Sequence, residues 1–273
     1  MTPALSIVIV SYNARADLER CLRSLADAPP AAPHEIAVVD HASPDGSADA
    51  VRRGFPAVRL LELPTNPGFA AGCNAGIRAT TGECVLLLNS DTSVPPGALD
   101  RLLERLRREP DVAVAGPRLV DAEGFPELSF GAMIAPLAEA RQKLLTGLLA
   151  RRVGPAVRYV QRLTSREQYP DWVSGACLLA RRADAEAAGL LDERFFLYTE
   201  DVDFCAAIRA RGRRVLYTPV AEVVHLRGRS RATVAEASEA AYRRSQVAFY
   251  EKHHPAWAPV LRAYLRIRGR LPR

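Results

Sequence analysis

The chain has 273 residues, of which 48% are hydrophobic and 25% are charged, with a formal net charge of +6. These proportions are typical of globular proteins and argue against a disordered chain, collagen and a coiled coil. The five cysteines form no Cys-x-x-Cys pair, so we expect small buried hydrophobic side chains in a reducing compartment rather than disulfides. The sequence has neither the basic start of a signal peptide nor a run of about 20 apolar residues, which predicts a cytoplasmic protein.

The first half of the chain alternates short apolar runs with helical patterns. The apolar runs suit strands that are buried on both faces of a parallel sheet. They are Leu5–Val10, Glu35–Val39, Val58–Leu63 and Cys84–Leu88. Helical spacing of apolar residues is found around Leu18–Leu25, Ala48–Arg53, Ala70–Ala79 and Ala98–Glu109. This alternation predicts an α/β fold with a mostly parallel central sheet flanked by helices.

The second half of the chain is less regular. Val112–Val120 has the pattern of a strand pair, and Trp172–Ala180 that of one strand with a glycine in its middle. Two short runs, Val215–Tyr217 and Glu222–His225, would end the sheet. We expect helices over Pro136–Leu149, Phe204–Arg211 and Ala232–Tyr250.

Polar side chains follow three of the predicted strands in the first half. They are Ser11–Asn13, Asp40–Asp45 and Asn89–Asp91. In open α/β sheets, ligands bind at the carboxyl ends of the strands. We therefore expect these residues to lie together at one edge of the sheet.

Asn89-Ser90-Asp91 offers a carboxylate beside an amide at the end of an apolar strand. Such oxygen ligands can hold Mg²⁺ or Mn²⁺, with a nucleotide diphosphate completing the coordination. A turn that caps the next helix explains the same residue types. His225 would be the natural nitrogen ligand for a metal also held by Asp91, although a lone histidine is more often structural.

Asp40 closes another buried strand, where its carboxylate needs a donor such as a nucleobase N–H or a ribose hydroxyl. The Pro44–Gly46 segment that follows is typical of a turn. The glycine-rich stretch from Asn66 to Gly76 would let backbone approach an anion, but it is neither a P-loop nor a GxGxxG motif.

Glu200-Asp201-Val202-Asp203 follows the aromatic segment Phe195–Tyr198. Carboxylates clustered beside aromatic surface can have raised pKa values and act as a general base. The same residues suit an acidic helix N-terminus that is stabilised by the helix dipole. Both interpretations can hold together, with Asp203 on the helix and Asp201 facing a cleft.

Seven segments, taken in chain order, resemble landmarks of the inverting glycosyltransferases of family two, which have a GT-A type fold. They are IVIVSYN, VVDHASPDGS, NPGFAAGCNAGI, LLLNSDT, WVSGACLLARR, FFLYTEDVDFC and VVHLRGRS. The likeness covers about Leu5 to His254 and is greatest to the rhamnosyltransferase-like branch, which builds bacterial surface polysaccharides. It implies transfer of a sugar from a nucleotide diphosphate donor to a hydroxyl of a glycan or lipid-linked acceptor, with inversion.

The resemblance also implies roles for matching residues. Asp201 would be the catalytic base, supported by Glu200, while Asp91 would be the chief ligand of Mg²⁺ or Mn²⁺, assisted by His225. The donor would be bound by Ser11, Tyr12, Asn13, Asp40, Ser43, Gly72, Asn74, Asn89 and Ser90, and the sugar and acceptor cleft shaped by Trp172, Gly175 and Ala176. The chain departs from the family pattern at Asn89, which replaces the first acid of an Asp-x-Asp metal motif, and at His41, where asparagine is usual.

On this resemblance, residues 1–230 form a GT-A catalytic domain, with a nucleotide-sugar-binding half (1–116) and an acceptor and catalytic half (117–230). C-terminal helices with a basic amphipathic tail follow over 231–273. The branch suggests dTDP-rhamnose as donor, while UDP- and GDP-sugars stay open. Two other interpretations are a sugar-phosphate nucleotidyltransferase, which would have a GxGxR-type start in place of Ser11–Asn13, and a non-catalytic nucleotide-sugar-binding subunit.

The tail over residues 256–273 is rich in arginine and has no acidic residue. Its arginines are Arg262, Arg266, Arg268, Arg270 and Arg273, and the interleaved apolar residues are Trp257, Val260, Leu261, Tyr264, Leu265 and Ile267. The pattern suits an interfacial helix facing anionic lipid, or a solvated tail packed on the domain. We expect peripheral attachment to the inner face of the cytoplasmic membrane and no nucleic-acid partner, since no recognition motif accompanies the arginines.

Overall fold

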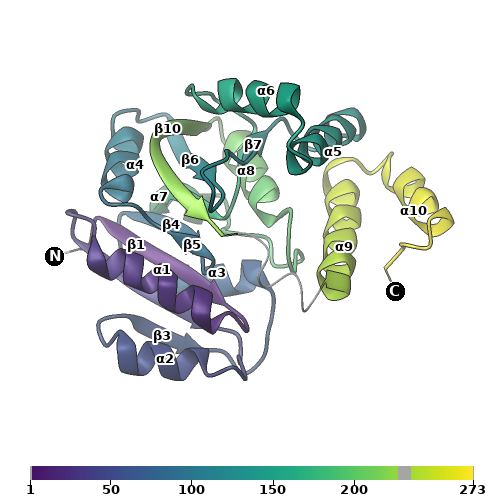
Figure 1. Cartoon of the computed structure of the whole chain (residues 1–273). Coiled ribbons are helices and arrows are strands. Elements are labelled where there is room, and N and C mark those ends of the chain that lie inside the picture. The colour runs from purple at the N-terminus through teal and green to yellow at the C-terminus, as the bar shows by residue number, and fades with distance from the viewer. Residues whose placement is uncertain (1, 227–234, 273) are drawn as a thin grey trace.

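The computed structural model describes residues 2–226 and 235–272. Its centre is an eight-stranded sheet with the order β3-β2-β1-β4-β9-β6-β10-β5, flanked by helices (Figure 1). The predicted α/β class is confirmed. The predicted boundary between residues 230 and 231, the Arg227–Ser230 end of the last motif and Arg273 lie outside the described residues.

The first half of the sheet is parallel, as the alternation of apolar runs and helical patterns predicts. Its strands are β1 (Leu5–Ser11), β2 (His34–Asp40), β3 (Arg59–Glu62) and β4 (Cys84–Asn89). The connecting helices are α1 (Arg15–Asp27), α2 (Ser47–Gly54) and α3 (Phe69–Arg78). Every position of β1 is buried because β2 and β4 pair with its two edges and helices cover its faces. The four predicted strands and the helices between them are therefore confirmed, with ends that differ by at most three residues.

The second half of the sheet mixes strand directions. β6 (Val112–Val120) and β10 (Arg214–His225) are parallel to each other, whereas β9 (Cys177–Arg181) is antiparallel to both β4 and β6, and β5 (Thr92–Ser93) is antiparallel to β10. Val112–Val120 is thus one strand and not the expected pair. The two expected runs at 215–217 and 222–225 are one strand, whose register shifts between Thr218 and Glu222.

Trp172–Ala180 does not form the single strand that its apolar pattern predicts. Trp172–Val173 is strand β8, which pairs with β7 (Phe130–Gly131) in a separate small sheet, and the main sheet resumes with β9 at Cys177. The chain turns between them at Gly175, whose backbone N–H faces the side chain of Asp201 rather than a neighbouring strand. A tertiary hydrogen bond has therefore replaced a ladder bond at the mid-strand glycine.

The core lies on both faces of the sheet. Successive residues of β1 alternate between the faces: Ile7 and Ile9 pack with α1 and α4 (Ala98–Arg107), while Val8 and Val10 pack on the side of α3 and α8 (Glu200–Ala210). Helix α8 begins at Glu200 and not at Phe204, because Glu200–Asp203 already form its first turn. The smaller helix α7 (Arg182–Ala187) follows β9.

Helices of the second half include one that the sequence pattern missed. α5 (Pro136–Ala150) is close to the expected helix, and α6 (Gly154–Thr164) lies in the stretch that showed no clear pattern. α9 (Ala235–His253) and α10 (Ala258–Ile267) are the two helices nearest the C-terminus in the described part of the chain. In the described residues no helix is both long and apolar enough to cross a membrane.

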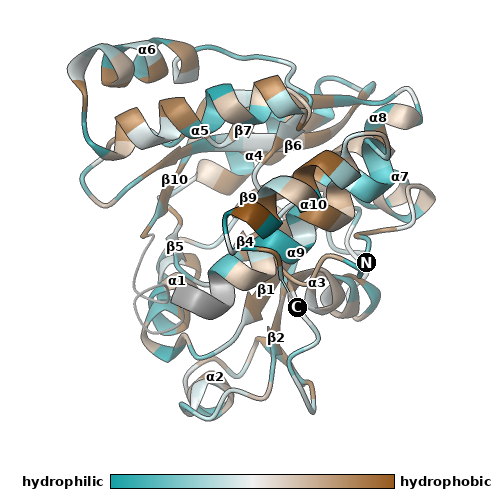
Figure 2. Cartoon of the chain, turned by 90° about the vertical axis from the view of Figure 1, so that its right-hand side faces the viewer, coloured by the Kyte–Doolittle hydropathy of each residue, from teal (hydrophilic) through white to brown (hydrophobic). Residues whose placement is uncertain are grey.

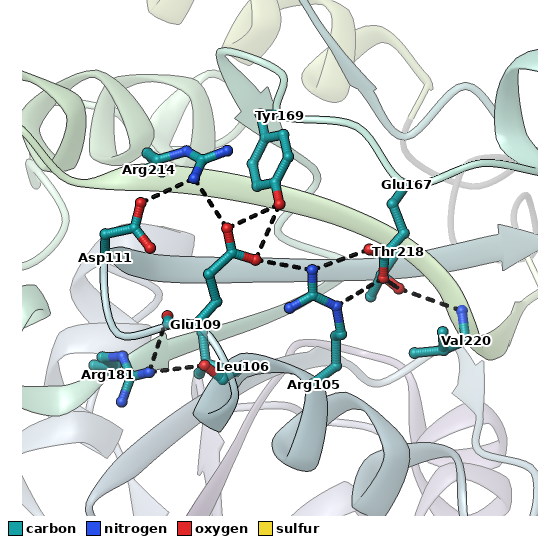
Figure 3. A network of polar contacts seen from close by, with 10 residues as sticks. All are labelled: Arg105, Leu106, Glu109, Asp111, Glu167, Tyr169, Arg181, Arg214, Thr218 and Val220. Carbon is teal, nitrogen blue, oxygen red and sulfur yellow. Dashed lines mark hydrogen bonds and ion pairs between the residues drawn. The ribbon is translucent and has the colours of Figure 1, made fainter.

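A polar network fixes the start of β10 to neighbouring elements (Figure 3). Glu109 accepts hydrogen bonds from Tyr169 at 2.8 Å and Arg214 at 2.9 Å. Arg105 on α4 donates to both oxygens of Glu167 at 2.8 and 2.9 Å, and Glu167 also binds Thr218. Because Thr218 lies where the register of β10 shifts, this network holds the irregular part of the strand in place.

Candidate active site

The three polar segments that follow the first-half strands lie at the same edge of the sheet. Ser11 on β1 is the register partner of Asp40 on β2, and Val10 is the partner of Asn89 on β4. The loops beyond them are tied together, because the backbone N–H of Asn13 donates to Ser43 Oγ at 3.0 Å and that of Ser43 to Asp40 Oδ2 at 2.9 Å. The predicted clustering is therefore confirmed.

Buried polar atoms at this edge lack hydrogen-bond partners within the described structure. These atoms are Ser11 Oγ and Asp40 Oδ1. Ser11 is 1% exposed and Asp40 is 2% exposed. Buried polar groups are normally paired, so such atoms suit contact with a polar ligand. Tyr12, beside them, is 45% exposed and therefore accessible to a ligand.

Gly72 serves a packing function here. A Cβ on Gly72 would lie 2.3 Å from Nε2 of His41, so only glycine lets α3 approach this ring. The other ring nitrogen of His41 pairs with Asn66 Oδ1 at 3.0 Å, and burial lowers the pKa of His41. The His41 ring therefore packs directly against Gly72.

Asn74 likewise has structural contacts in place of the expected ligand contact. Its side chain donates to Leu191 O at 2.8 Å and to Glu193 Oε1 at 2.9 Å, and accepts from Leu191 N at 3.1 Å. The residue is 1% exposed. The hydrogen bonds of Asn74 therefore connect α3 to the 191–193 segment, and we do not assign this side chain to the donor site.

Asp91 and His225 meet at the end of the sheet. His225 Nε2 lies 3.2 Å from Asp91 Oδ1, and His225 Nδ1 lies 3.1 Å from Glu127 Oε2. Strand pairing brings them together, since His225 on β10 is the partner of Thr92 and Leu226 N donates to Asp91 O at 2.8 Å. Burial lowers the pKa of His225, but the hydrogen bonds and charges of Asp91 and Glu127 outweigh it and raise the pKa to about 9.

The donor set of this pair fits a divalent cation that is shared with a phosphate ligand. The described residues contain no group of three or more His, Cys, Asp or Glu placed to hold a metal alone. Mg²⁺ usually takes only one or two carboxylates from a protein and completes its shell with substrate phosphates and water. One carboxylate and one imidazole, Asp91 and His225, are consistent with that arrangement. Glu127, which orients His225, gave no signal in the sequence because it lies in a stretch without a readable pattern.

Asp201 lies against the loop that connects β8 to β9. Its Oδ2 accepts from Gly175 N at 2.8 Å, and a Cβ on Gly175 would lie 3.3 Å from its Cβ. The next residue, Ala176, accepts a hydrogen bond from Asn89 N at 3.0 Å. Asp201 and the Asn89–Asp91 segment, far apart in the sequence, are thus joined through two adjacent backbone groups.

Glu200 and Asp201 occupy a buried acidic environment. Burial raises the pKa of Asp201, and the backbone N–H groups of Gly175 and Val202 lower it in part. Burial and then the charge of Asp201 raise the pKa of Glu200 well above its ordinary value, and Glu200 Oε2 has no hydrogen-bond partner in the described residues. A carboxylate with a raised pKa is suited to take up a proton near neutral pH.

The turn before these acids has an uncommon backbone. Tyr198 and Thr199 have φ values of 69° and 67°, in the left-handed region that non-glycine residues rarely adopt. Strain of this kind costs about 1–3 kcal/mol per residue and is concentrated at functional sites. It orients the first turn of α8, which carries Asp201.

The remaining predicted site residues have mixed environments. Ser90 is partly exposed beside Asp91. Trp172 is largely buried, donates from Nε1 to Ala132 O at 2.9 Å and packs on Gly131. Trp172 therefore holds the small β7–β8 sheet together beside the loop that carries Gly175.

Comparison with known proteins gives consistent results. A family model described as Glycosyl transferase family 2 matches residues 6–154. The chain is 32% identical over 304 aligned residues to the N-acetylglucosaminyl-diphospho-decaprenol L-rhamnosyltransferase of Mycobacterium tuberculosis, covering 100% of this chain and 96% of that protein. It is 25% identical over 234 residues to a low-salt glycan biosynthesis hexosyltransferase of Haloferax volcanii, covering 82% of this chain and 68% of the relative.

Solved structures of similar fold agree. Mannosyltransferase PcManGT from Pyrobaculum calidifontis, in complex with GDP-Man and Mn²⁺, superposes with a TM-score of 0.61 at 21% sequence identity. The match covers 97% of this chain and 69% of the mannosyltransferase chain. GalNAc-T7 with UDP, GalNAc and Mn²⁺ has a TM-score of 0.62 at 15% identity, covering 90% of this chain and 48% of its own. The predicted GT-A type fold is therefore confirmed.

Proposed function

Because the chain belongs to glycosyltransferase family 2, we propose that it transfers a sugar from a nucleotide diphosphate donor to an acceptor hydroxyl with inversion at the anomeric carbon. The observation that carries this proposal is the hydrogen-bonded path from Asp201 through Gly175 and Ala176 to Asn89. It brings a carboxylate suited to be a base to the edge of the sheet where a donor would bind.

The donor nucleotide is assigned to the ends of β1, β2 and β4. Ser11 and Asp40 present buried oxygens there that have no hydrogen-bond partner in the described part of the chain, and such oxygens suit ribose hydroxyls and base N–H groups. Asp91 and His225 would hold Mg²⁺ or Mn²⁺, and Glu127 would orient the imidazole. When bound, such a cation offsets the charge that develops on the diphosphate as it leaves.

Asp201 is assigned as the general base. A new bond forms between the acceptor oxygen and the anomeric carbon, and the bond from that carbon to the diphosphate oxygen breaks on the opposite side. The proton of the acceptor hydroxyl passes to the carboxylate of Asp201. The N–H of Gly175 holds Oδ2, so the carboxylate has a fixed orientation before the acceptor arrives.

The acceptor is assigned to the second half of the chain. A pocket of about 370 Å³ opens beside His225, lined among others by Phe125, Glu127 and Thr146. The similar mycobacterial enzyme is named for a lipid-linked acceptor, N-acetylglucosaminyl-diphospho-decaprenol, and for L-rhamnose transfer. We extend both features to this chain: a lipid-linked sugar acceptor in cell-surface polysaccharide synthesis, and dTDP-rhamnose as the first donor to test.

Contact with a membrane surface is part of the proposal. Exposed apolar side chains of α10 and of Trp257, which caps its N-terminus, are interleaved with arginines; those of α10 include Val260, Tyr264 and Ile267. Figure 2 shows α10 and α5 on the same side of the molecule, and α5 adds the exposed Leu137 and Leu144. A basic surface with protruding apolar groups fits an anionic lipid headgroup layer.

The test is donor binding and turnover by the unmodified chain. Thermal shift with dTDP, UDP and GDP, each with Mn²⁺, with Mg²⁺ and with EDTA, identifies the nucleotide, because ligands that bind the folded state raise its melting temperature. Release of the nucleotide diphosphate from the matching sugar donor, accelerated by a lipid-linked sugar acceptor, would support the proposal. Binding without any turnover would indicate a non-catalytic nucleotide-sugar-binding subunit instead.

A further inference from the structure

Helix α9 contacts the turn that precedes Asp201. Ser245 Oγ donates to the backbone carbonyl of Leu197 at 2.8 Å, and Ser245 is itself buried. The ring of Tyr242, one helical turn earlier, meets the ring of Tyr198 edge-on at 5.9 Å between centroids. One contact falls on Leu197, directly before the left-handed backbone of Tyr198 and Thr199, and the other on Tyr198 itself.

The same helix also contacts the first turn of α8 beyond Asp201. Asp203 accepts from Lys252 Nζ at 2.9 Å and pairs with His253 Nε2 at 2.6 Å, and its side chain is only 3% exposed. Asp203 N donates to Thr199 O at 2.9 Å, which closes that turn. Helix α9 therefore binds the chain on both sides of Asp201.

An adjacent face of α9, which carries Tyr242, Gln246 and Tyr250, is anchored to α5. Glu139 on α5 accepts from Gln246 Nε2 at 2.5 Å and from Tyr250 OH at 2.8 Å. Left-handed backbone at non-glycine residues persists only where the surroundings impose it. Helix α9 contacts this turn through Ser245 and Tyr242 and is itself supported by α5.

We propose that α9 positions the catalytic base, with Ser245 and Lys252 as positioning residues that hold the 197–203 turn in its reactive form. The inference rests on the proposed function, since it takes Asp201 as the base. It places a requirement for catalysis in α9, which like Asp201 lies outside residues 6–154, the part of the chain that the family model matches. The donor site at the ends of β1, β2 and β4 has no contact with Ser245 or Lys252 among the hydrogen bonds and ion pairs of the described residues.

The test uses the full chain with Ser245→Ala and, separately, Lys252→Met. Misplacing a catalytic group by about 1 Å can cost about 100-fold in rate. Because each variant removes only one of the contacts with the turn, we expect a smaller displacement and a kcat for sugar transfer that is lower by about 10-fold. The Kd of the nucleotide diphosphate in the presence of metal should stay at the value of the unmodified chain. Lys252→Arg keeps a cation opposite Asp203 and should restore most of kcat.

Arg244→Ala is the matched control, because Arg244 is an exposed residue of α9 next to Ser245. This variant should leave kcat unchanged. An unchanged kcat in both Ser245→Ala and Lys252→Met, with an active parent enzyme, would overturn the inference alone. Parallel loss of kcat and of nucleotide affinity, without rescue by Lys252→Arg, would show general damage to the fold and would also overturn it. A parent chain that turns over no donor would refute the proposed function itself.

Discussion

The backbone N–H of Gly175 donates to Asp201 Oδ2 at 2.8 Å. This bond joins a loop of the sheet to the first turn of α8. Because Ala176, the next residue, accepts from Asn89 N at 3.0 Å, Asp201 lies close to the Asn89–Asp91 segment. The base and the candidate metal ligand are therefore neighbours that different backbone groups hold, Gly175 N–H for Asp201 and Leu226 N–H for Asp91, so substitutions of the two side chains should have separable effects.

Replacing the base should strongly reduce donor turnover and leave nucleotide binding almost unchanged. In Asp201→Asn the amide oxygen can still accept from Gly175 N, so the local structure should persist while the proton acceptor is lost. We expect donor turnover to fall about 10²–10⁴-fold, the usual contribution of a general base, with little change in Kd for the nucleotide diphosphate. Asp27→Asn, at an exposed position of α1, serves as control. Near-normal turnover in Asp201→Asn would remove Asp201 from this role.

Replacing the carboxylate beside His225 should abolish the metal dependence of donor binding. Asp91→Ala removes the only carboxylate of the proposed Asp91–His225 ligand pair, and the binding of a nucleotide diphosphate should become the same with Mn²⁺ as with EDTA. Calorimetric titration of the nucleotide with and without metal measures this directly. If Asp91→Ala still bound the nucleotide more tightly with Mn²⁺ than with EDTA, the ligand assignment would be wrong.

Asp40→Asn tests the nucleotide side of the site. A hydrogen bond to a charged group contributes about 1.5–3 kcal/mol, so loss of the carboxylate should weaken nucleotide binding about 10- to 100-fold. The effect should be as large for the nucleoside diphosphate as for the complete sugar donor, because Asp40 is assigned to base or ribose. Asp49→Asn, an exposed carboxylate on α2, is the comparison. Equal affinity in Asp40→Asn and the parent would place the nucleotide elsewhere.

Glu200 should destabilise the folded protein at neutral pH. Its pKa in the folded state is raised by burial, so the folded state binds a proton more tightly than the unfolded state. Stability attributable to this group is therefore present below the ordinary carboxyl pKa and is lost as the pH rises toward the raised value. Glu200→Gln should raise the free energy of unfolding at pH 8, and the gain over the parent should shrink as the pH falls toward 4.

Urea unfolding of both proteins across this pH range measures the difference. A Glu200→Gln variant that is less stable than the parent at pH 8 would mean that Glu200 is held as a stabilised anion. The expected gain should be absent in Glu186→Gln, which changes an exposed glutamate of α7.

Membrane contact should depend on the exposed apolar residues of α10 and on Trp257, which caps its N-terminus. Truncation after Pro255 would also remove Leu265, which is fully buried, so surface substitutions are the sharper test. Trp257→Ser combined with Ile267→Ser should reduce sedimentation with phosphatidylglycerol vesicles, while pure phosphatidylcholine vesicles should bind weakly in every case. Val220→Ser, an exposed valine on β10, should bind vesicles like the parent. Unchanged sedimentation of the double variant would exclude this surface.

The amino-acid sequence by itself determined the parallel first half and the edge where Ser11, Asp40 and Asn89 meet. This was possible because local periodicity marks each strand and parallel strands must end on the same side. It also singled out Asp91 and His225, whose contact the structure confirms.

Tertiary structure alone decided the rest. The break at Gly175, the pairing of Glu127 with His225 and the burial of Asn74 against Leu191 all depend on contacts between residues 26 to 117 positions apart. The contacts of α9 with the 197–203 turn also join residues that are far apart in the sequence. Such contacts produce no periodic pattern in the sequence. The hydrogen-bond partner of each polar group is determined only when distant segments pack together and exclude water.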